Sequence, residues 1–509
     1  MKAKALLFLA AAAIVLAGWW IYSPAFHGGW LWDDNTNITE NSLMRDPAAL
    51  WKIWFAPQSL DYYPLQMSVE WIQWRWWGMD TFGYHLTNVC MQVLNGFLLW
   101  RVLRKLGLRF AWLGGLLLVV HPMTVESVAW IVEVKNTMSL AFLLLAFDAW
   151  IDWDARATPA LLWYGLSLLY FLAAMLSKAS VVMFPVILLL HAWWRRGRVA
   201  RRDLVASLPF FAVSLGLGVA ALWLQRHRAM AALVVPMGGP FSRVAVEGLA
   251  AAFYFWKFVM PVGLMPIYPR WDVDPPSAAQ FLPWLVIGGL AWLLWKTGRR
   301  GVLFGLGVFL VDLIPVSGLF TVSFMRLTWV MDHLAYVPLV GLIGLAVAGL
   351  GAVFEGAPEN RRAQIRIVSW VVVSAIVAAL AFESHAYART FSSGRAYWTS
   401  AVERNPGAWA ARYNLALILV EAGEFPEAIA HLEQAVRLDP DYTEAHVNLA
   451  NALSQTGRYA EAIPHFERAL QLDPANAVTH YNFGLALRAL GRRDEARSQL
   501  LEAAELARH

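Results

Sequence analysis

The sequence predicts an all-α protein in which a polytopic membrane helix bundle of about eleven spans precedes a helical solenoid. Of the 509 residues, 59% are hydrophobic and only 15% are charged, and the mean hydropathy is +0.48. Soluble domains carry roughly a quarter charged residues, so most of this chain must be dissolved in lipid. Near residue 395 the composition changes, and small residues then recur at a fixed period. We therefore expect a membrane domain over residues 1–390 and a repeat domain over 396–509.

The predicted spans begin with residues 5–22, which follow two lysines. This apolar run is longer than the core of a signal peptide, so we expect an uncleaved anchor. Many of the 28 tryptophans stand beside apolar runs, as expected for indoles at the headgroup level. The other predicted spans lie at residues 86–103, 110–121, 128–151, 160–177, 179–194, 204–224, 281–296, 302–320, 335–354 and 367–384.

Lysine and arginine clusters in the short loops predict the orientation, because cytoplasmic loops are enriched in these residues. Placing every cluster in the cytoplasm requires that residues 244–264, with Glu247 and Lys257, form a re-entrant or interfacial helix. The N-terminus is then cytoplasmic and the C-terminus is outside. The loops 23–84 and 225–280 share the outer face, and the short loops suit a bacterial inner membrane. The clusters are Lys2/Lys4, Arg101/Arg104/Lys105/Arg109, Arg195/Arg196/Arg198/Arg201/Arg202, Lys296/Arg299/Arg300 and Arg361/Arg362/Arg366.

The C-terminal region has an internal repeat of 34 residues, which is typical of tetratricopeptide repeats (TPR), pairs of antiparallel helices. Residues 396–406 are predicted to be the last helix of a preceding, degenerate repeat. Three stacked repeats form a short concave surface suited to an extended peptide or a partner protein. A plain scaffold or a dimerisation module is the alternative. The recurring residues are Gly423/Gly457/Gly491, Ala428/Ala462/Ala496, Ala435/Ala469/Ala503 and Pro406/Pro440/Pro474.

An acid pair, Asp33 and Asp34, follows the first apolar run in Trp30-Leu31-Trp32-Asp33-Asp34. Adjacent carboxylates at a membrane surface can take a proton from an acceptor or hold a divalent metal ion, and the sequence leaves the metal open. The alternative is a solvated turn, because Asp-Asp-Asn is common in loops.

Two further outer segments carry candidate groups. His121 and Glu126 lie in His121-Pro122-Met123-Thr124-Val125-Glu126, where they can bind a cation or a sugar hydroxyl. The alternative is a helix N-terminus, with Pro122 in its first turn. Lys178 separates two apolar runs on the outer side, where it can contact a lipid phosphate; snorkelling is the alternative.

Four more residues complete the candidate site. Arg326 can bind phosphate and Asp332 can orient it, although an ion pair between them is equally plausible. Arg270 adds a cation, and the Trp271 indole can stack on a sugar face. Asp312, inside a span, is expected to be a helix-packing group satisfied by a neighbour.

Several function classes are excluded or have no visible motif. There is no Walker loop, no Gly-x-Gly-x-x-Gly opening a helix, no Cys/His zinc spacing and no Gly-x-Ser-x-Gly elbow. The one cysteine, Cys90, excludes an intrachain disulfide framework. The net charge of +5 is accounted for by short basic loops, so no nucleic-acid partner is expected.

Taken together, these features resemble the GT-C glycosyltransferase superfamily, and in particular the transmembrane-plus-TPR O-mannosyltransferase group and its bacterial relatives. The chain departs from the eukaryotic members in having only about three repeats. The features that carry the resemblance are Trp32-Asp33-Asp34 with Asn41, His121-Pro122 with Glu126, Ser177-Lys178, Asp332-His333-Leu334-Ala335-Tyr336-Val337-Pro338 and the C-terminal repeats.

The resemblance implies transfer of a sugar, with mannose as the first candidate, from a polyprenyl-phosphate carrier to a protein hydroxyl on the extracytoplasmic face. Asp34 would then be the general base and Asp33 its orienting partner. Lys178, Arg326 and Arg270 would hold the lipid phosphate. The membrane spans would hold the prenyl tail, and the TPR groove would hold the protein acceptor.

Two other functions stay open. A non-enzymatic membrane scaffold would recruit envelope proteins with its repeats and would not need the acid pair. A transporter or flippase for a lipid-linked sugar would need charged residues along an intramembrane path, for which Asp148 and Asp312 are the obvious candidates.

Overall fold

The computed structural model describes residues 2–56, 62–156, 160–230 and 235–508, and this part of the chain contains helices and no strand. The chain divides into two compact units. The N-terminal unit comprises residues 1–264 and 270–393, and the repeat unit comprises residues 265–269 and 394–509. Parts of the predicted loops 23–84 and 225–280, residues 57–61 and 231–234, lie outside the described residues.

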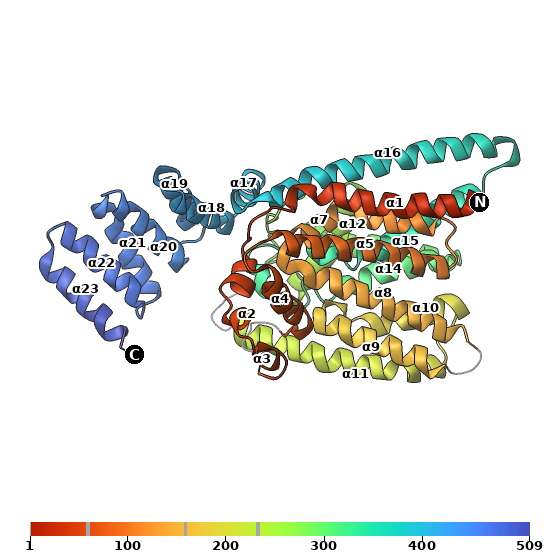
Figure 1. Cartoon of the computed structure of the whole chain (residues 1–509), viewed down its shortest axis with the longest axis horizontal. Coiled ribbons are helices and arrows are strands. Elements are labelled where there is room, and N and C mark those ends of the chain that lie inside the picture. Colours follow the sequence, from red (N-terminus) through yellow and green to blue (C-terminus); the bar gives the residue numbers. More distant parts are fainter. Residues whose placement is uncertain (1, 57–61, 157–159, 231–234, 509) are drawn as a thin grey trace. The chain divides into compact units, whose positions relative to one another are not determined.

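The N-terminal unit is a bundle whose long helices run side by side (Figure 1). Each of the eleven predicted apolar runs contains a helix, in which the backbone groups of an apolar segment find their hydrogen-bond partners within the segment. The helices are α1 (Lys2–Tyr22), α2 (Ser42–Arg45), α3 (Ala49–Phe55), α4 (Pro64–Trp77), α5 (Phe82–Lys105), α6 (Ala111–Val120), α7 (Val125–Ala129), α8 (Val134–Asp154), α9 (Leu161–Ser177), α10 (Phe184–Arg196), α11 (Arg201–Leu224), α12 (Pro240–Val259), α13 (Leu282–Lys296), α14 (Arg300–Leu313), α15 (Leu339–Glu355) and α16 (Arg362–Ala388).

The predicted count of eleven spans is not found. Within the described residues, six helical stretches are long and apolar enough to cross a bilayer, or seven if the pair 111–120 and 122–129, bent by 62°, is one span. Helices α10 and α14 have 13 and 14 residues. They rise only about 20 Å, whereas the hydrocarbon core is about 30 Å thick. The six stretches are Lys4–Ala25, Phe82–Lys105, Ile131–Asp154, Arg201–Arg228, Ala278–Lys296 and Glu359–Ser392.

Ion pairs join basic clusters at one end of the bundle, where α5, α8 and α10 end and α11 begins; this end is called the basic end. Lys105, at the end of α5, lies 2.7 Å from Asp152 near the end of α8. Arg196, at the end of α10, lies 2.8 Å from Asp154 and 2.6 Å from Asp203 at the start of α11. Two of the predicted basic clusters, that of Arg101 to Arg109 and that of Arg195 to Arg202, therefore share one end of the bundle.

The candidate intramembrane acid Asp148 belongs to the same network. Its carboxylate lies 2.9 Å from the Arg101 Nε and 2.8 Å from the Lys105 Nζ. Asp148 is thus a partner of two cations near the basic end, and this pairing accounts for a carboxylate inside an apolar helix.

The opposite end of α8 is formed by broken helices. Chain direction changes after α6, and the short elements η3 (Pro122–Thr124), α7 and η4 (Ile131–Glu133) lead into α8. An amide stripe on α5 donates hydrogen bonds to buried backbone carbonyls at and near these breaks, where such groups need partners. Its side chains, spaced four and three residues apart, share one helix face. The contacts are Asn88 to Trp130 O (3.0 Å) and Ile131 O (3.2 Å), Gln92 to Leu118 O (2.8 Å) and Asn95 to Thr137 O (2.8 Å).

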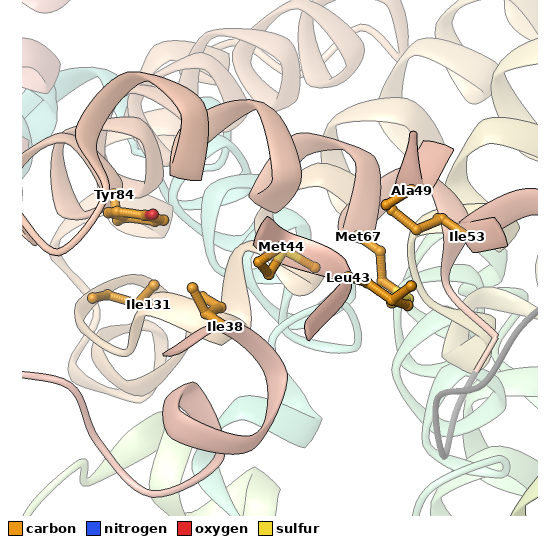
Figure 2. Packing of buried hydrophobic residues seen from close by; sticks show 8 residues of the cluster. All are labelled: Ile38, Leu43, Met44, Ala49, Ile53, Met67, Tyr84 and Ile131. Atoms are coloured by element: carbon orange, nitrogen blue, oxygen red, sulfur yellow. The ribbon is translucent and has the colours of Figure 1, made fainter. Parts of the chain in front are cut away.

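A hydrophobic cluster holds the segment between α1 and α5 against this end (Figure 2). In it, Ile38 and Met44 are fully buried, and Ile38 lies beside Ile131 of η4. Apolar packing therefore fixes the acid-pair segment next to η4. The other members of the cluster are Leu43, Ala49, Ile53, Met67 and Tyr84.

The repeat unit contains three helix pairs, and the preceding helix falls where the degenerate repeat was predicted. Gly423, Gly457 and Gly491 have φ between 77° and 79°, a left-handed conformation in the turn of each pair that favours glycine. The alanines that recur with them are buried where the paired helices meet. The helices are α17 (Gly394–Arg404), α18 (Trp409–Glu421), α19 (Phe425–Leu438), α20 (Thr443–Gln455), α21 (Tyr459–Leu472), α22 (Ala477–Ala489) and α23 (Arg493–Leu506).

Candidate functional site

Asp34 is completely buried, and both of its carboxylate oxygens accept hydrogen bonds from the backbone. Leu31 N–H donates to Oδ2 at 2.8 Å, and Val132 N–H donates to Oδ1 at 2.9 Å. Burial raises the pKa of Asp34 well above its usual value, and the two backbone donors oppose that shift. The side chain thus ties its own loop to η4.

Asp33 has a different environment, because it is only half-buried. The preceding residue, Trp32, has φ of +39°, a strained conformation for a residue with a side chain. Its ring stacks on Trp130 with centroids 5.8 Å apart and planes 10° apart. Of the acid pair, Asp33 is therefore the more accessible carboxylate, held on a strained turn of the kind that clusters at functional sites.

Glu133, the last residue of η4, holds two lysines. Its carboxylate lies 2.9 Å from Lys135 Nζ and 3.5 Å from Lys178 Nζ, and it also accepts a hydrogen bond from Asn136. Lys178 is only 7% exposed, which decides against a snorkelling lysine, because its ammonium group is buried with a counter-ion.

The acid pair and Lys178 thus meet on one three-residue element. Asp34 binds the backbone of Val132, and Lys178 lies against the side chain of the next residue, Glu133. Both therefore lie at the end of α8 opposite the basic end. Since α8 has 21 residues, these ends are about 31 Å apart, close to the thickness of a bilayer core.

Glu126 and His333 lie beside Trp130, which contacts the acid-pair loop. His333 N–H donates to Glu126 Oε2 at 2.8 Å, and the His333 Nδ1 lies 3.3 Å from that oxygen. The Trp130 indole donates to Leu31 O at 3.3 Å, and its ring lies 6.1 Å from the His333 ring. Glu126 is thus a fixed member of this end of the bundle.

His121 and Asp332 make contacts that hold helices in place. His121 Nε2 lies 3.1 Å from Phe258 O, and its Nδ1 accepts a hydrogen bond from Met123 N–H, so the ring caps η3. Asp332 accepts a hydrogen bond from the Tyr387 hydroxyl at 3.1 Å, which joins η9 (Asp332–Ala335) to α16. The helix N-terminus weighed for His121 agrees with its contacts.

Arg270 and Trp271 form a separate aromatic cluster. The Arg270 guanidinium lies 4.3 Å from the centre of the Trp329 ring and donates to Pro236 O at 2.9 Å. Trp329 in turn donates to Trp271 O at 3.0 Å. These contacts do not bring Arg270 to the Asp34 and Lys178 region. Arg326, which is half-buried, ends the short helix η8 (Ser323–Arg326).

Two cavities adjoin α14 among the described residues. The larger has a volume of about 520 Å³ and is walled mainly by aliphatic and aromatic side chains of α5, α8, α10, α14 and α15. The smaller, of about 10 Å³, is lined by Asn136, Lys178, His333 and other residues. Asp312 of α14 lines both. The expectation that a neighbour satisfies Asp312 is wrong, because neither carboxylate oxygen has a hydrogen-bond partner among the described residues.

Glu70 of α4 is a buried acid near the pair that the sequence did not point to. It is 1% exposed, and its Oε1 accepts a hydrogen bond from Gln66 at 2.7 Å. Burial raises the pKa of Glu70 to about 8, and Gln66 and Lys135 oppose the shift. Glu70 in turn raises the pKa of Asp34.

This shift predicts a pH dependence of stability. A carboxyl whose pKa is higher in the folded state stabilises that state below the unfolded pKa, near 4.5, and this contribution is lost as pH rises to about 8. We expect Glu70→Gln to reduce the fall in the thermal unfolding midpoint between pH 5 and 8, measured on the full chain in detergent. The exposed Glu40→Gln is the control. An unchanged slope in Glu70→Gln would contradict the assignment.

The acid pair does not stand within a metal-ligand set. Among the residues that the structure describes, no three His, Cys, Asp or Glu side chains are arranged to hold a metal ion.

The sequence missed Glu133, Lys135 and Asn136. All three lie at the start of the predicted span 128–151, where a polar cluster was counted as part of an apolar run. The signal that could have identified them is a group of charged and amide residues at the start of an apolar run. In the structure α8 begins at Val134, and Glu133 precedes it.

Comparisons with known proteins bear on the C-terminal region. Two family models, both described as tetratricopeptide repeat, match residues 380–443, 416–477 and 453–509. The C-terminal region consists of tetratricopeptide repeats. The matched models cover residues 380–509, so the glycosyltransferase resemblance of the preceding residues stays a prediction.

Solved structures give a limited likeness. A crystal structure of MamA is 24% identical over 23% of this chain and 67% of that chain, and another is 25% identical over 22% and 62%, both with a TM-score of 0.22. The structure titled MamA MSR-1 C2 is 16% identical over 42% of this chain and 96% of that chain, also with a TM-score of 0.22. No curated protein matches the chain.

Proposed function

We propose that this chain is an integral membrane protein that captures an extended protein segment on its tetratricopeptide repeats. The observation that carries the proposal is the row of first helices, α18, α20 and α22, whose side chains contact one another from repeat to repeat. Stacked repeats of this kind form concave surfaces for protein partners. The N-terminal unit, with its six candidate spans, would hold these repeats at a membrane surface.

The chemistry of this row of helices suits a peptide backbone. Asn448 donates to the Tyr413 hydroxyl at 3.0 Å, and Asn482 donates to Asn451 Oδ1 at 3.1 Å. Tyr481 is 52% exposed on α22. Amide side chains donate to and accept from backbone groups, and tyrosine adds apolar contact at a low entropic cost. The bound segment would therefore be extended and would need no fixed charge.

The proposal is tested with a photo-crosslinking amino acid in the full chain, expressed in its own membrane. Placed at Tyr481, the crosslinker should give a discrete protein adduct, and the Asn448→Ala/Asn482→Ala variant should lose most of it. At Arg497, on the second helix of the same repeat, it should give no such adduct. Equal adducts at both positions, or an adduct insensitive to the asparagine changes, would contradict capture by the first helices.

A second function, transfer of a sugar from a polyprenyl-phosphate carrier to the captured protein, has one specific observation in its favour. The accessible Asp33 and the buried Lys178 lie at one end of α8, and the apolar cavity extends along α14 from the basic end to Asp312, which lines the small cavity together with Lys178. This arrangement supports an acid–base group and a cation beside space for a lipid tail. Mannose is the first candidate for the sugar, and the bacterial inner membrane the first for the location.

In this reaction a hydroxyl oxygen of the acceptor attacks the anomeric carbon. The bond from that carbon to the phosphate oxygen breaks, and the lipid phosphate leaves with the electron pair, facing Lys178. The hydroxyl proton passes to a carboxylate. We assign that role to Asp33, since both oxygens of Asp34 are occupied by backbone donors and the side chain is fully buried.

Asp33→Asn is then expected to lower transfer by about 10²–10⁴-fold, the usual value of general base assistance, with capture at Tyr481 unchanged. The assay follows radiolabelled sugar from a polyprenyl-phosphate donor into protein in membranes. Full transfer by this variant would remove Asp33 as the base. Capture without any transfer by the unmodified chain would leave the protein-binding function alone.

A further inference from the structure

The carboxylate of Asp312 in the N-terminal unit is buried, and no described residue gives it a hydrogen bond that stabilises it. It is 3% exposed near the end of α14, and neither oxygen has a hydrogen-bond partner within the described part of the chain. A buried carboxylate without donors is costly, by several kcal/mol when unpaired. An unsatisfied buried group in a native protein calls for an explanation, and a donor supplied by a bound ligand is one such explanation.

The position of Asp312 shows what kind of ligand reaches it. It stands where the apolar cavity of about 520 Å³ meets the small polar cavity. The apolar cavity follows α14 from Gly301 to Asp312, which is about 17 Å of helix. Its volume lies in the range of about 300–1,000 Å³ that ligand sites occupy. Ala348 and Gly349 line it and are exposed, so the cavity opens at the surface of the bundle.

The polar cavity adds groups of opposite charge to the same place. Lys178 and His333 line it together with Asp312, and Asn136 contributes an amide. The charge of Lys178 is balanced by Glu133, which also binds Lys135. A molecule entering here meets one cation, one carboxylate and a histidine at the end of an apolar channel.

We propose that Asp312 binds the headgroup of an amphiphile whose single apolar chain occupies the cavity along α14. Its carboxylate accepts hydrogen bonds from hydroxyl or ammonium groups of that headgroup, and Lys178 faces the headgroup's anionic part. This inference rests on the second function proposed above. Asp312 gives specificity for the headgroup, and the cavity that holds the apolar tail of the ligand contributes affinity.

The proposal is tested by native mass spectrometry of the full chain held in amphipol, with three probes that share a twelve-carbon chain. Dodecyl maltoside carries hydroxyl donors, dodecylamine carries an ammonium group, and dodecylphosphocholine carries no hydrogen-bond donor. Asp312→Asn should weaken the two donor probes at least tenfold and leave dodecylphosphocholine unchanged. The stronger donor probe distinguishes a sugar-bearing source of the ligand from an amine-bearing one.

Two further variants keep the outcome interpretable. Ala348→Trp, which fills the cavity, should abolish binding of all three probes. Asp152→Asn, a matched change at the basic end, should leave every probe unaffected, and thermal unfolding should show each variant folded. Binding that Ala348→Trp blocks but Asp312→Asn leaves intact would overturn the role of Asp312 and preserve the lipid cavity. No binding by the unmodified chain would overturn both.

Discussion

Replacing Asp34 by alanine is expected to destabilise the N-terminal unit by about 2–5 kcal/mol. The change leaves two buried backbone N–H groups, of Leu31 and Val132, without acceptors, and each such group costs about 1–3 kcal/mol. Asp34→Asn should also destabilise, because its amide nitrogen faces one of these donors. The measurement is the thermal unfolding midpoint of the full chain in detergent.

Asp33→Ala is the matched control, since its half-buried side chain should cost much less. Equal unfolding midpoints for the two alanine variants would contradict the anchoring role of Asp34. The two unfolding midpoints are also a control for the sugar-transfer assay. An Asp34 variant would lose transfer activity on unfolding as well as on loss of a base. For this reason the base is tested at Asp33.

Glu133→Gln is expected to cost about 3–5 kcal/mol, because it removes the counter-ion of a buried lysine. The double variant Glu133→Gln/Lys178→Met should regain much of that loss, since the unpaired ammonium is then removed as well. The unfolding midpoints of the two single variants and the double variant form a double-mutant cycle. Glu461→Gln, in the exposed pair with Arg458, is the control and should leave the unfolding midpoint nearly unchanged.

An additive result, in which the double variant loses the sum of the two single losses, would mean that Glu133 and Lys178 do not stabilise each other. The geometry predicts coupling because both groups are buried, Glu133 with 1% and Lys178 with 7% of its surface exposed.

Local patterns predicted the helices and the repeats well. Apolar runs became helices because a buried backbone needs hydrogen-bond partners within its own segment. The 34-residue period placed Gly457 in a left-handed turn and Ala462 between paired helices. These features depend on residues close in sequence, and such interactions are readable from one chain.

Other features depend on contacts between distant segments. The span count was too high because hydropathy marks an apolar run but does not give the length of its helix, and α10 ends after 13 residues. The meeting of Asp34 with Val132 joins residues 98 positions apart. Asp312 was expected to be satisfied because an isolated carboxylate in a span is costly, and the sequence carries no sign of the two cavities beside it.

In the proposed orientation, the Asp34 and Lys178 end of the bundle faces one side of the membrane and the basic end faces the other. Cysteine labelling in sealed vesicles of known orientation, in a Cys90→Ser background, tests this directly. An impermeant maleimide applied to the extracytoplasmic side should label Thr36→Cys and Gln471→Cys, and should label Arg198→Cys only after permeabilisation. Labelling of Thr36→Cys and Arg198→Cys from the same side would contradict the proposed orientation of the bundle.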